Sequence, residues 1–150
     1  MSEFYASSLR HRPPFLFVDE KLCAQVPNGV WVQAKFEASN PYLTGEIIPR
    51  PLLIEALAQS MALIKNNESV KRGVLAVIKN FKFLRDVQKA ESIYLYSALL
   101  VRRGKFLFHE AKVFVKSEAN VGPWSWPPSA HQLQEICHGE LILAQPEFTS

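Results

Sequence analysis

The sequence predicts an α+β domain in which a largely antiparallel sheet wraps around one long central helix. Two observations predict this fold class. One strongly apolar stretch has the length of a helix, and the segments that flank it are rich in β-branched and aromatic residues with the alternation of strands. No internal repeat or linker divides the 150 residues, so we expect residues 1–150 to form a single domain.

The central helix is expected over residues 51–64, PLLIEALAQSMALI, with Pro51 at its first position. Only Glu55, Gln59 and Ser60 interrupt the apolar run, and a helix that is apolar on all sides belongs in the middle of a domain. Burying a glutamate is costly unless it is paired, hydrogen-bonded or protonated, which makes Glu55 the first candidate for catalytic chemistry. A structural role is the alternative, because a negative charge is favoured near a helix N-terminus and Gln59 lies on the same face.

Strands are expected on both sides of this helix. The first two, residues 15–18 and 30–36, are joined by turn residues at 27–29, and a second hairpin turn is expected at 102–105, RRGK. The strands after the helix are expected at 74–83, 92–101, 106–116 and 139–144. Residues 118–136 include VGPWSWPPS, which cannot continue a central strand. We expect an inserted loop there, acting as a lid or a dimer contact.

Composition excludes several classes of protein. Hydrophobic residues make up 48% and charged residues 21%, a balance typical of globular domains, and a net charge of +3 is too weak to indicate a nucleic-acid partner. No apolar run approaches the length of a membrane span or of a signal peptide. The two cysteines, Cys23 and Cys137, suit free thiols in a reducing compartment. We therefore expect a cytoplasmic protein with neither a nucleic-acid nor a membrane partner.

The common ligand-binding motifs are missing from the sequence. There is no glycine-rich phosphate loop, and Cys137, His138 and His131 lack the spacing of a zinc site, so we expect no metal and no other cofactor. His109 lies inside a predicted strand, where we expect it to face solvent or to bond a neighbour. One sheet around one helix leaves open edges, so we expect a dimer, formed through the sheet edge or the helix face.

Three segments resemble a known enzyme family. Residues 9–20 (LRHRPPFLFVDE), 40–43 (NPYL) and 52–64 (LLIEALAQSMALI) resemble the hotdog-fold 3-hydroxyacyl-[acyl-carrier-protein] dehydratases, and GVLAVIKNFKFLRDV and HGELILA extend the resemblance more weakly. The resemblance implies a hotdog fold. It also implies dehydration of a 3-hydroxyacyl thioester to the trans-2-enoyl thioester, in fatty acid, aryl-polyene or polyketide-type synthesis.

The family mechanism implied by the resemblance needs a histidine as general base and a helix carboxylate as general acid, with backbone N–H groups at the helix start polarising the thioester carbonyl. The carboxylate corresponds to Glu55. The usual Gly-His-Phe-Pro motif is missing, because residues 44–51 read TGEIIPRP. His11 could supply the base, as in short-loop relatives that keep this histidine, or it could be structural.

Two other functions stay open at this point. In one, Glu55 alone activates water, as in some hotdog thioesterases. In the other, the chain is a non-catalytic hotdog partner or an acyl-binding subunit that kept the substrate tunnel and lost the chemistry.

The resemblance also implies how substrate and partners would bind. The acyl chain would run along the helix past Pro51, Leu52, Leu53 and Phe83. The helix spacing separately predicts that Gln59, four residues after Glu55, holds the Glu55 carboxyl in place. The phosphopantetheine arm would leave past basic side chains toward an acidic acyl carrier protein. The active form would be a homodimer, or a heterodimer with a second hotdog subunit.

Overall fold

The structure is a computed structural model and describes residues 16–65, 74–118 and 122–145. Six strands, one α-helix and one short 3-10 helix lie within these residues. In chain order they are β1 (Val18–Val26), β2 (Gly29–Ala34), α2 (Arg50–Met61), β3 (Val74–Phe83), β4 (Ile93–Arg103), β5 (Phe106–Lys116), η2 (Ala130–Gln132) and β6 (Leu133–Ala144).

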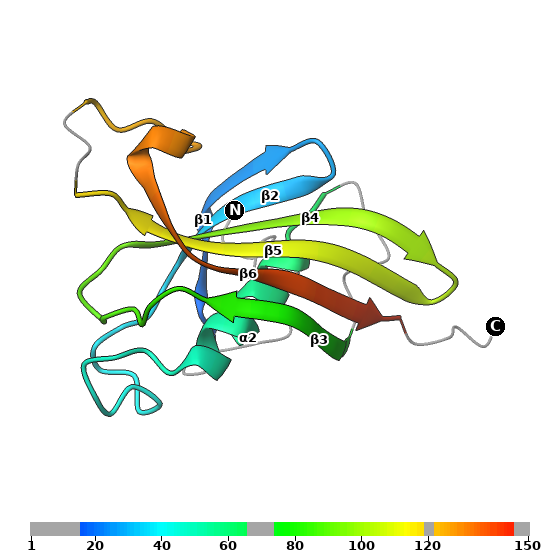
Figure 1. Ribbon diagram of the computed structural model, residues 1–150, viewed down its shortest axis with the longest axis horizontal. Coiled ribbons are helices and arrows are strands. Elements are labelled where there is room, and N and C mark those ends of the chain that lie inside the picture. Colours follow the sequence, from blue (N-terminus) through cyan, green and yellow to red (C-terminus); the bar gives the residue numbers. More distant parts are fainter. Residues whose placement is uncertain (1–15, 66–73, 119–121, 146–150) are drawn as a thin grey trace.

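The strands form one antiparallel sheet in the order β1-β2-β4-β5-β6-β3. The helix α2 lies on one face of this sheet, which we call the inner face, and it packs mainly against β1, β2, β4 and β5 (Figure 1). The predicted α+β architecture, an antiparallel sheet around one central helix, is confirmed.

The core forms where the inner face meets the helix. Alternate residues of β5 are buried, and the buried side of α2 supplies Leu53, Ala56 and Leu57, which are all fully buried. This alternation is typical of a sheet with one face packed and the other face toward solvent. Within the described residues, no helix is long and apolar enough to cross a membrane.

Two predicted strands differ from the structure by several residues, whereas the predicted helix and the strands β2 and β4 differ by at most three residues at either end. The first was predicted at residues 15–18, where the apolar run is strongest, but β1 is Val18–Val26. Among the described strands, β1 lies at the edge of the sheet and pairs only with β2, and its polar side chains obscure the alternation of a strand. The last was predicted at 139–144, but β6 begins at Leu133 and takes in the end of the predicted insertion 118–136.

The turns agree better with the prediction. Asn28 has a φ of 58°, the left-handed conformation that asparagine tolerates well, and it joins β1 to β2 within the predicted turn. Gly104 has a φ of 59° in the tight connection between β4 and β5. A glycine suits this backbone because it carries no Cβ.

The described part of the insertion folds onto the sheet. The ring centres of Trp124 and Trp126 lie 5.0 and 6.1 Å from that of Tyr94 on β4. Gln132, which is 1% exposed, holds the loop together, because its side-chain oxygen accepts from Ser125 and from the backbone and hydroxyl of Ser129. Its amide nitrogen donates to the carbonyl of Pro123. The described residues of the insertion therefore pack against the sheet. Whether the insertion acts as a lid or a dimer contact stays a prediction.

Candidate functional site

The candidate site centres on Glu55 and Gln59, two polar side chains on α2. Gln59 is 2% exposed, and its side-chain oxygen accepts a hydrogen bond of 2.9 Å from the backbone N–H of Phe17. An N–H donor can be met only by the oxygen of the amide, so the Gln59 nitrogen must point the other way. It donates to Oε1 of Glu55 at 3.3 Å. The side-chain pair predicted from the helical spacing is confirmed.

Helix geometry explains why these two side chains meet. Residues four apart lie on the same side of a helix, and Leu53, Ala56 and Leu57 occupy the side that faces the sheet. Glu55 is therefore held half-buried away from the core. Phe17, fully buried and stacked on Phe36 with ring centres 5.2 Å apart, brings the chain that enters β1 against this part of the helix.

The predicted substrate-contacting residues are distributed around the start of α2. Pro51 is exposed, Leu52 and Phe83 are half-buried, and Leu53 is fully buried in the core. The Arg50 guanidinium lies 4.7 Å from the centre of the Phe83 ring, which places Phe83 beside the helix start. Leu53 instead packs in the core, since it lies on the side of the helix that faces the sheet.

Two backbone positions at the start of α2 provide no free N–H donor for a thioester carbonyl. Pro51 has no N–H, and the N–H of Leu52 donates to the carbonyl of Pro49 at 3.0 Å. These two positions cannot polarise a thioester carbonyl in the structure as it stands. The other predicted catalytic residue, His11, lies outside the described residues.

His109 on β5 differs from its sequence-based interpretation. It was expected to face solvent or bond a neighbour, but it is fully buried, and neither ring nitrogen forms a hydrogen bond of good geometry with a described residue, although the backbone carbonyls of Leu107 and Leu141 lie nearby. Burial lowers the pKa of His109 from 6.5 to about 4, and the backbone carbonyls of Leu107 and Leu141 offset this only in part. The alternation of β5, in which Leu107, Ala111 and Val113 face the core, was the signal that could have identified it.

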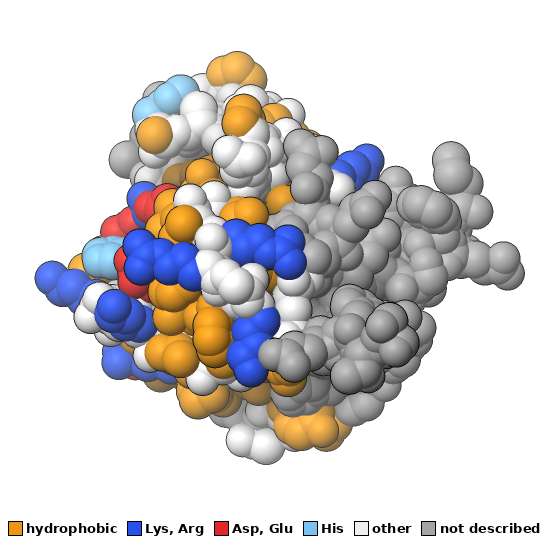
Figure 2. Space-filling view, turned by 90° about the vertical axis from the view of Figure 1, so that its right-hand side faces the viewer, with side chains coloured by type: hydrophobic (Ala, Val, Ile, Leu, Met, Phe, Trp, Pro, Cys, Tyr) orange, Lys and Arg blue, Asp and Glu red, His pale blue; other side chains and the backbone are white. Residues whose placement is uncertain are grey.

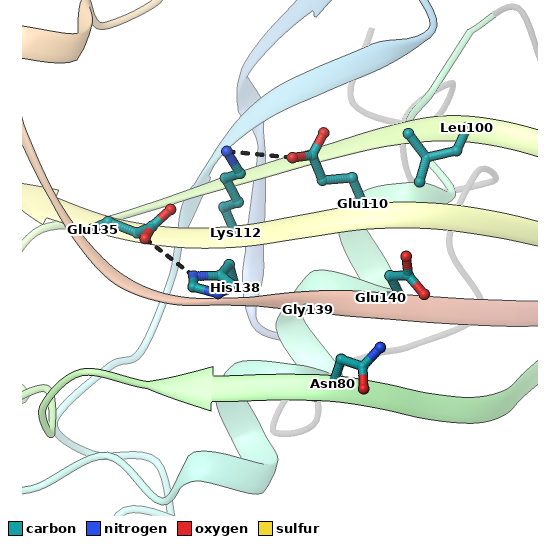
Figure 3. Close-up of a pocket in the computed structure, with 8 residues that line it drawn as sticks. All are labelled: Asn80, Leu100, Glu110, Lys112, Glu135, His138, Gly139 and Glu140. Carbon is teal, nitrogen blue, oxygen red and sulfur yellow. Dashed lines mark hydrogen bonds and ion pairs between the residues drawn. The ribbon is translucent and has the colours of Figure 1, made fainter.

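A groove of about 620 Å³ lies on the other face of the sheet, with α2 behind it (Figure 3). Most of the side chains that line it are charged, and two pairs of them are in contact. Nζ of Lys112 lies 3.3 Å from Oε1 of Glu110, and Nδ1 of His138 lies 3.1 Å from Oε2 of Glu135. The full lining is Asn80, Leu100, Glu110, Lys112, Glu135, His138, Gly139 and Glu140. Because Glu55 is not among these residues, we do not assign the groove to the candidate site.

Comparisons with known proteins agree with this arrangement, although no family model matches the chain. The chain is 30% identical over 117 residues to the 3-hydroxyacyl-[acyl-carrier-protein] dehydratase FabZ of Rickettsia typhi, a match that covers 72% of this chain and 81% of that protein. Among solved structures it is similar to the dehydratase heterocomplex ApeI:P from Xenorhabdus doucetiae, with a TM-score of 0.71 and 17% identity over 97% of this chain and 92% of that one.

A further solved structure shares the fold at much lower identity. It is a hypothetical thioesterase with coenzyme A from Streptococcus pneumoniae TIGR4, with a TM-score of 0.58 and 9% identity, and the match covers 100% of this chain and 99% of that one. The sheet around one helix and these two structures together define a hotdog-fold protein. Within that class, the chain belongs to the family of the 3-hydroxyacyl-[acyl-carrier-protein] dehydratases.

Proposed function

We propose that this chain dehydrates a 3-hydroxyacyl thioester, carried on an acyl carrier protein, to the trans-2-enoyl thioester. Membership of the dehydratase family supports the reaction. The single observation that carries the site is the Gln59 amide, which bridges the Phe17 N–H and the Glu55 carboxyl. A carboxyl fixed in this way can transfer a proton to a reacting group without first having to be oriented.

The reaction needs one proton removed and one supplied. A base takes a proton from C2 of the acyl group, the C2–C3 double bond forms, and the bond from C3 to its hydroxyl breaks. The hydroxyl leaves as water after accepting a proton from the acid, which we assign to Glu55. The base can then return its proton to Glu55 through solvent, so no cofactor is consumed.

We assign the base to His11 on the resemblance of residues 9–20 to the start of the family sequence. The histidine of the usual Gly-His-Phe-Pro motif has no counterpart in residues 44–51. His109 is not a second candidate, because it is fully buried on β5 and not beside Glu55 on α2.

We propose a homodimer, joined along β3, as the active form. The strand β3 lies at an edge of the sheet, and three of its apolar side chains are largely exposed: Val74 at 63%, Ile78 at 52% and Val77 at 43%. Figure 2 shows hydrophobic side chains between Lys and Arg on the end of the molecule that includes the start of this strand. An apolar edge strand of this kind pairs readily with another chain.

The mass of the purified protein in solution tests this assembly. Twice the mass of one chain supports the homodimer, whereas a stable monomer contradicts it. Assembly only with a second hotdog protein would indicate a heterodimer, and the ApeI:P dehydratase of similar fold is itself a heterocomplex. The cytoplasmic location stays a prediction from the sequence.

The decisive experiment is mass spectrometry of a 3-hydroxyacyl carrier protein incubated with the wild type or with Glu55→Gln. We expect the wild type to remove one water from the acyl group and the variant to be slower by roughly 10²- to 10⁴-fold, the usual contribution of a general acid. The matched control is Glu37→Gln, which makes the same change at an exposed carboxylate in the loop after β2 and should retain full activity.

Other outcomes would assign other functions. Release of the free acid would replace the proposal with a thioesterase, and an unchanged acyl group would indicate a partner or acyl-binding subunit. His11→Ala tests the base separately. It should stop dehydration, and a variant with wild-type turnover would remove His11 from the mechanism.

A further inference from the structure

The edge strand β3 contains a bulge that redirects one aromatic side chain. Lys79 pairs with Glu140 on β6 and Lys82 pairs with His138, so two residues of β3, Asn80 and Phe81, lie opposite a single residue of β6. Asn80 has a φ of 56°, in the left-handed region that asparagine adopts more readily than most residues. A bulge of this kind bends the strand and re-aims the neighbouring side chain.

The residue opposite the bulge is Gly139, and the Phe81 ring occupies the place where its side chain would be. A Cβ on Gly139 would lie 2.6 Å from Cγ of Phe81 and 2.7 Å from Cε2. Gly139 pairs with Ala111, which belongs to the core, so the ring lies on the inner face of the sheet. The position of the Phe81 ring, which we call its seat, therefore requires a glycine at position 139.

Phe81 and Phe83 form a pair of aromatic rings, which we call the aromatic wall, that leads toward the helix α2. The ring centre of Phe81 lies 6.2 Å from that of Phe83, which in turn contacts the Arg50 guanidinium at the start of α2. Glu55 follows roughly 7 Å further along the helix axis. Both phenylalanines are only partly buried against the core, and they extend the inner face beyond the strands that α2 mainly covers.

We propose that Phe81, seated on Gly139, is a specificity-determining residue whose ring forms one wall of the acyl channel and limits the bulk of the chain that fits beside it. This inference rests on the proposed function, because a channel wall selects only if an acyl chain passes it. The wall is apolar and the Phe81 ring packs closely over Gly139, as suits a surface that selects by shape.

Two substitutions are expected to change the width of the channel in opposite directions. Phe81→Ala removes the ring and widens the channel. Gly139→Ala keeps the ring but displaces it away from the sheet, since the new Cβ would overlap it. The double variant has no ring to displace, so it should behave like Phe81→Ala alone, a dependence that a purely additive loss of stability would not produce.

The experiment measures kcat/KM for 3-hydroxyacyl pantetheine thioesters of increasing chain length. We expect Phe81→Ala to raise the ratio of long-chain to short-chain kcat/KM by roughly tenfold, and Gly139→Ala to lower it by a similar factor, the discrimination that one or two methylene groups usually give. Phe108→Ala is the matched control, because this phenylalanine lies on the outer face of β5. It should leave the ratio unchanged.

The outcomes separate this inference from the proposed function. If the wild type dehydrates no thioester of the series, the proposed function fails. If the wild type is active but Phe81→Ala changes all chain lengths by the same factor, the proposed function stands and the role of Phe81 is wrong. Phe81→Ala alone decides the question if Gly139→Ala does not fold.

Discussion

Gln59 on α2 and His109 on β5 are both polar and almost completely buried, yet only one of them has its hydrogen bonds satisfied. The Gln59 amide bonds the Phe17 N–H and the Glu55 carboxyl, whereas neither nitrogen of His109 forms a hydrogen bond of good geometry with a described residue. An unsatisfied buried polar group typically costs about 1–3 kcal/mol of stability. The buried amide on α2 is therefore paired on both of its sides, whereas the buried imidazole on β5 has no well-formed hydrogen bond to a described residue.

The two side chains also differ in what acid does to them. The Gln59 amide does not titrate, so its contribution to the free energy of unfolding does not follow the pH directly. His109 is neutral in the folded protein because burial lowers its pKa from 6.5 to about 4. In the unfolded chain the imidazole recovers its ordinary pKa, so between these two values protons bind the unfolded state preferentially.

The largest expected effect is therefore a loss of stability in acid that depends on His109. The contribution of the neutral His109 imidazole to the free energy of unfolding is fully present above about pH 6.5. It is lost progressively as the pH falls through about 4. We expect a loss of roughly 3 kcal/mol across this interval, since each unit of pKa shift is worth about 1.4 kcal/mol. His109→Leu should remove it. Urea denaturation of both proteins at several pH values measures the difference.

The difference between the two proteins isolates His109, because carboxylates that titrate in the same interval contribute equally to both. His109→Gln is the matched control: it keeps a polar side chain but cannot bind a proton, so it should follow the pH profile of His109→Leu at lower overall stability. Wild type and His109→Leu with parallel profiles would show that the buried imidazole is stabilised by a contact that the comparison with Gln59 leaves out.

Local patterns were sufficient to predict much of this fold. The apolar run predicted α2, and alternation and β-branched residues predicted β3 and β5 at the bounds that the structure has. The i, i+4 spacing predicted that Gln59 reaches Glu55. These features depend on residues close in sequence, so the chain reveals them without its tertiary structure.

Long-range contacts could not be predicted in the same way. The Phe17 N–H that orients Gln59 lies 42 residues away in the chain, and no periodicity relates the two. The helix pattern likewise could not separate Leu53, which faces the sheet, from Leu52, which is half-buried. A polar edge strand such as β1 has no clear alternation, which is why its position was predicted wrongly.

The smaller expected effect comes from removing the hydrogen bonds of the Gln59 amide. Gln59→Leu keeps the volume of the side chain but leaves the buried Phe17 N–H without its acceptor. We expect a loss of about 2 kcal/mol in the free energy of unfolding, within the usual cost of an unsatisfied buried donor. Dehydration should also slow, with kcat falling on the order of tenfold, because the Glu55 carboxyl loses one donor that orients it.

Gln88→Leu is the matched control for this variant, since it makes the same change at an exposed glutamine and should leave both quantities near the wild-type values. Thermal or urea unfolding gives the stability, and steady-state kinetics separates kcat from KM. A lower stability with unchanged kcat would restrict Gln59 to anchoring the chain at Phe17. A lower kcat at nearly unchanged KM would support the proposal that the same amide also positions Glu55 as the acid.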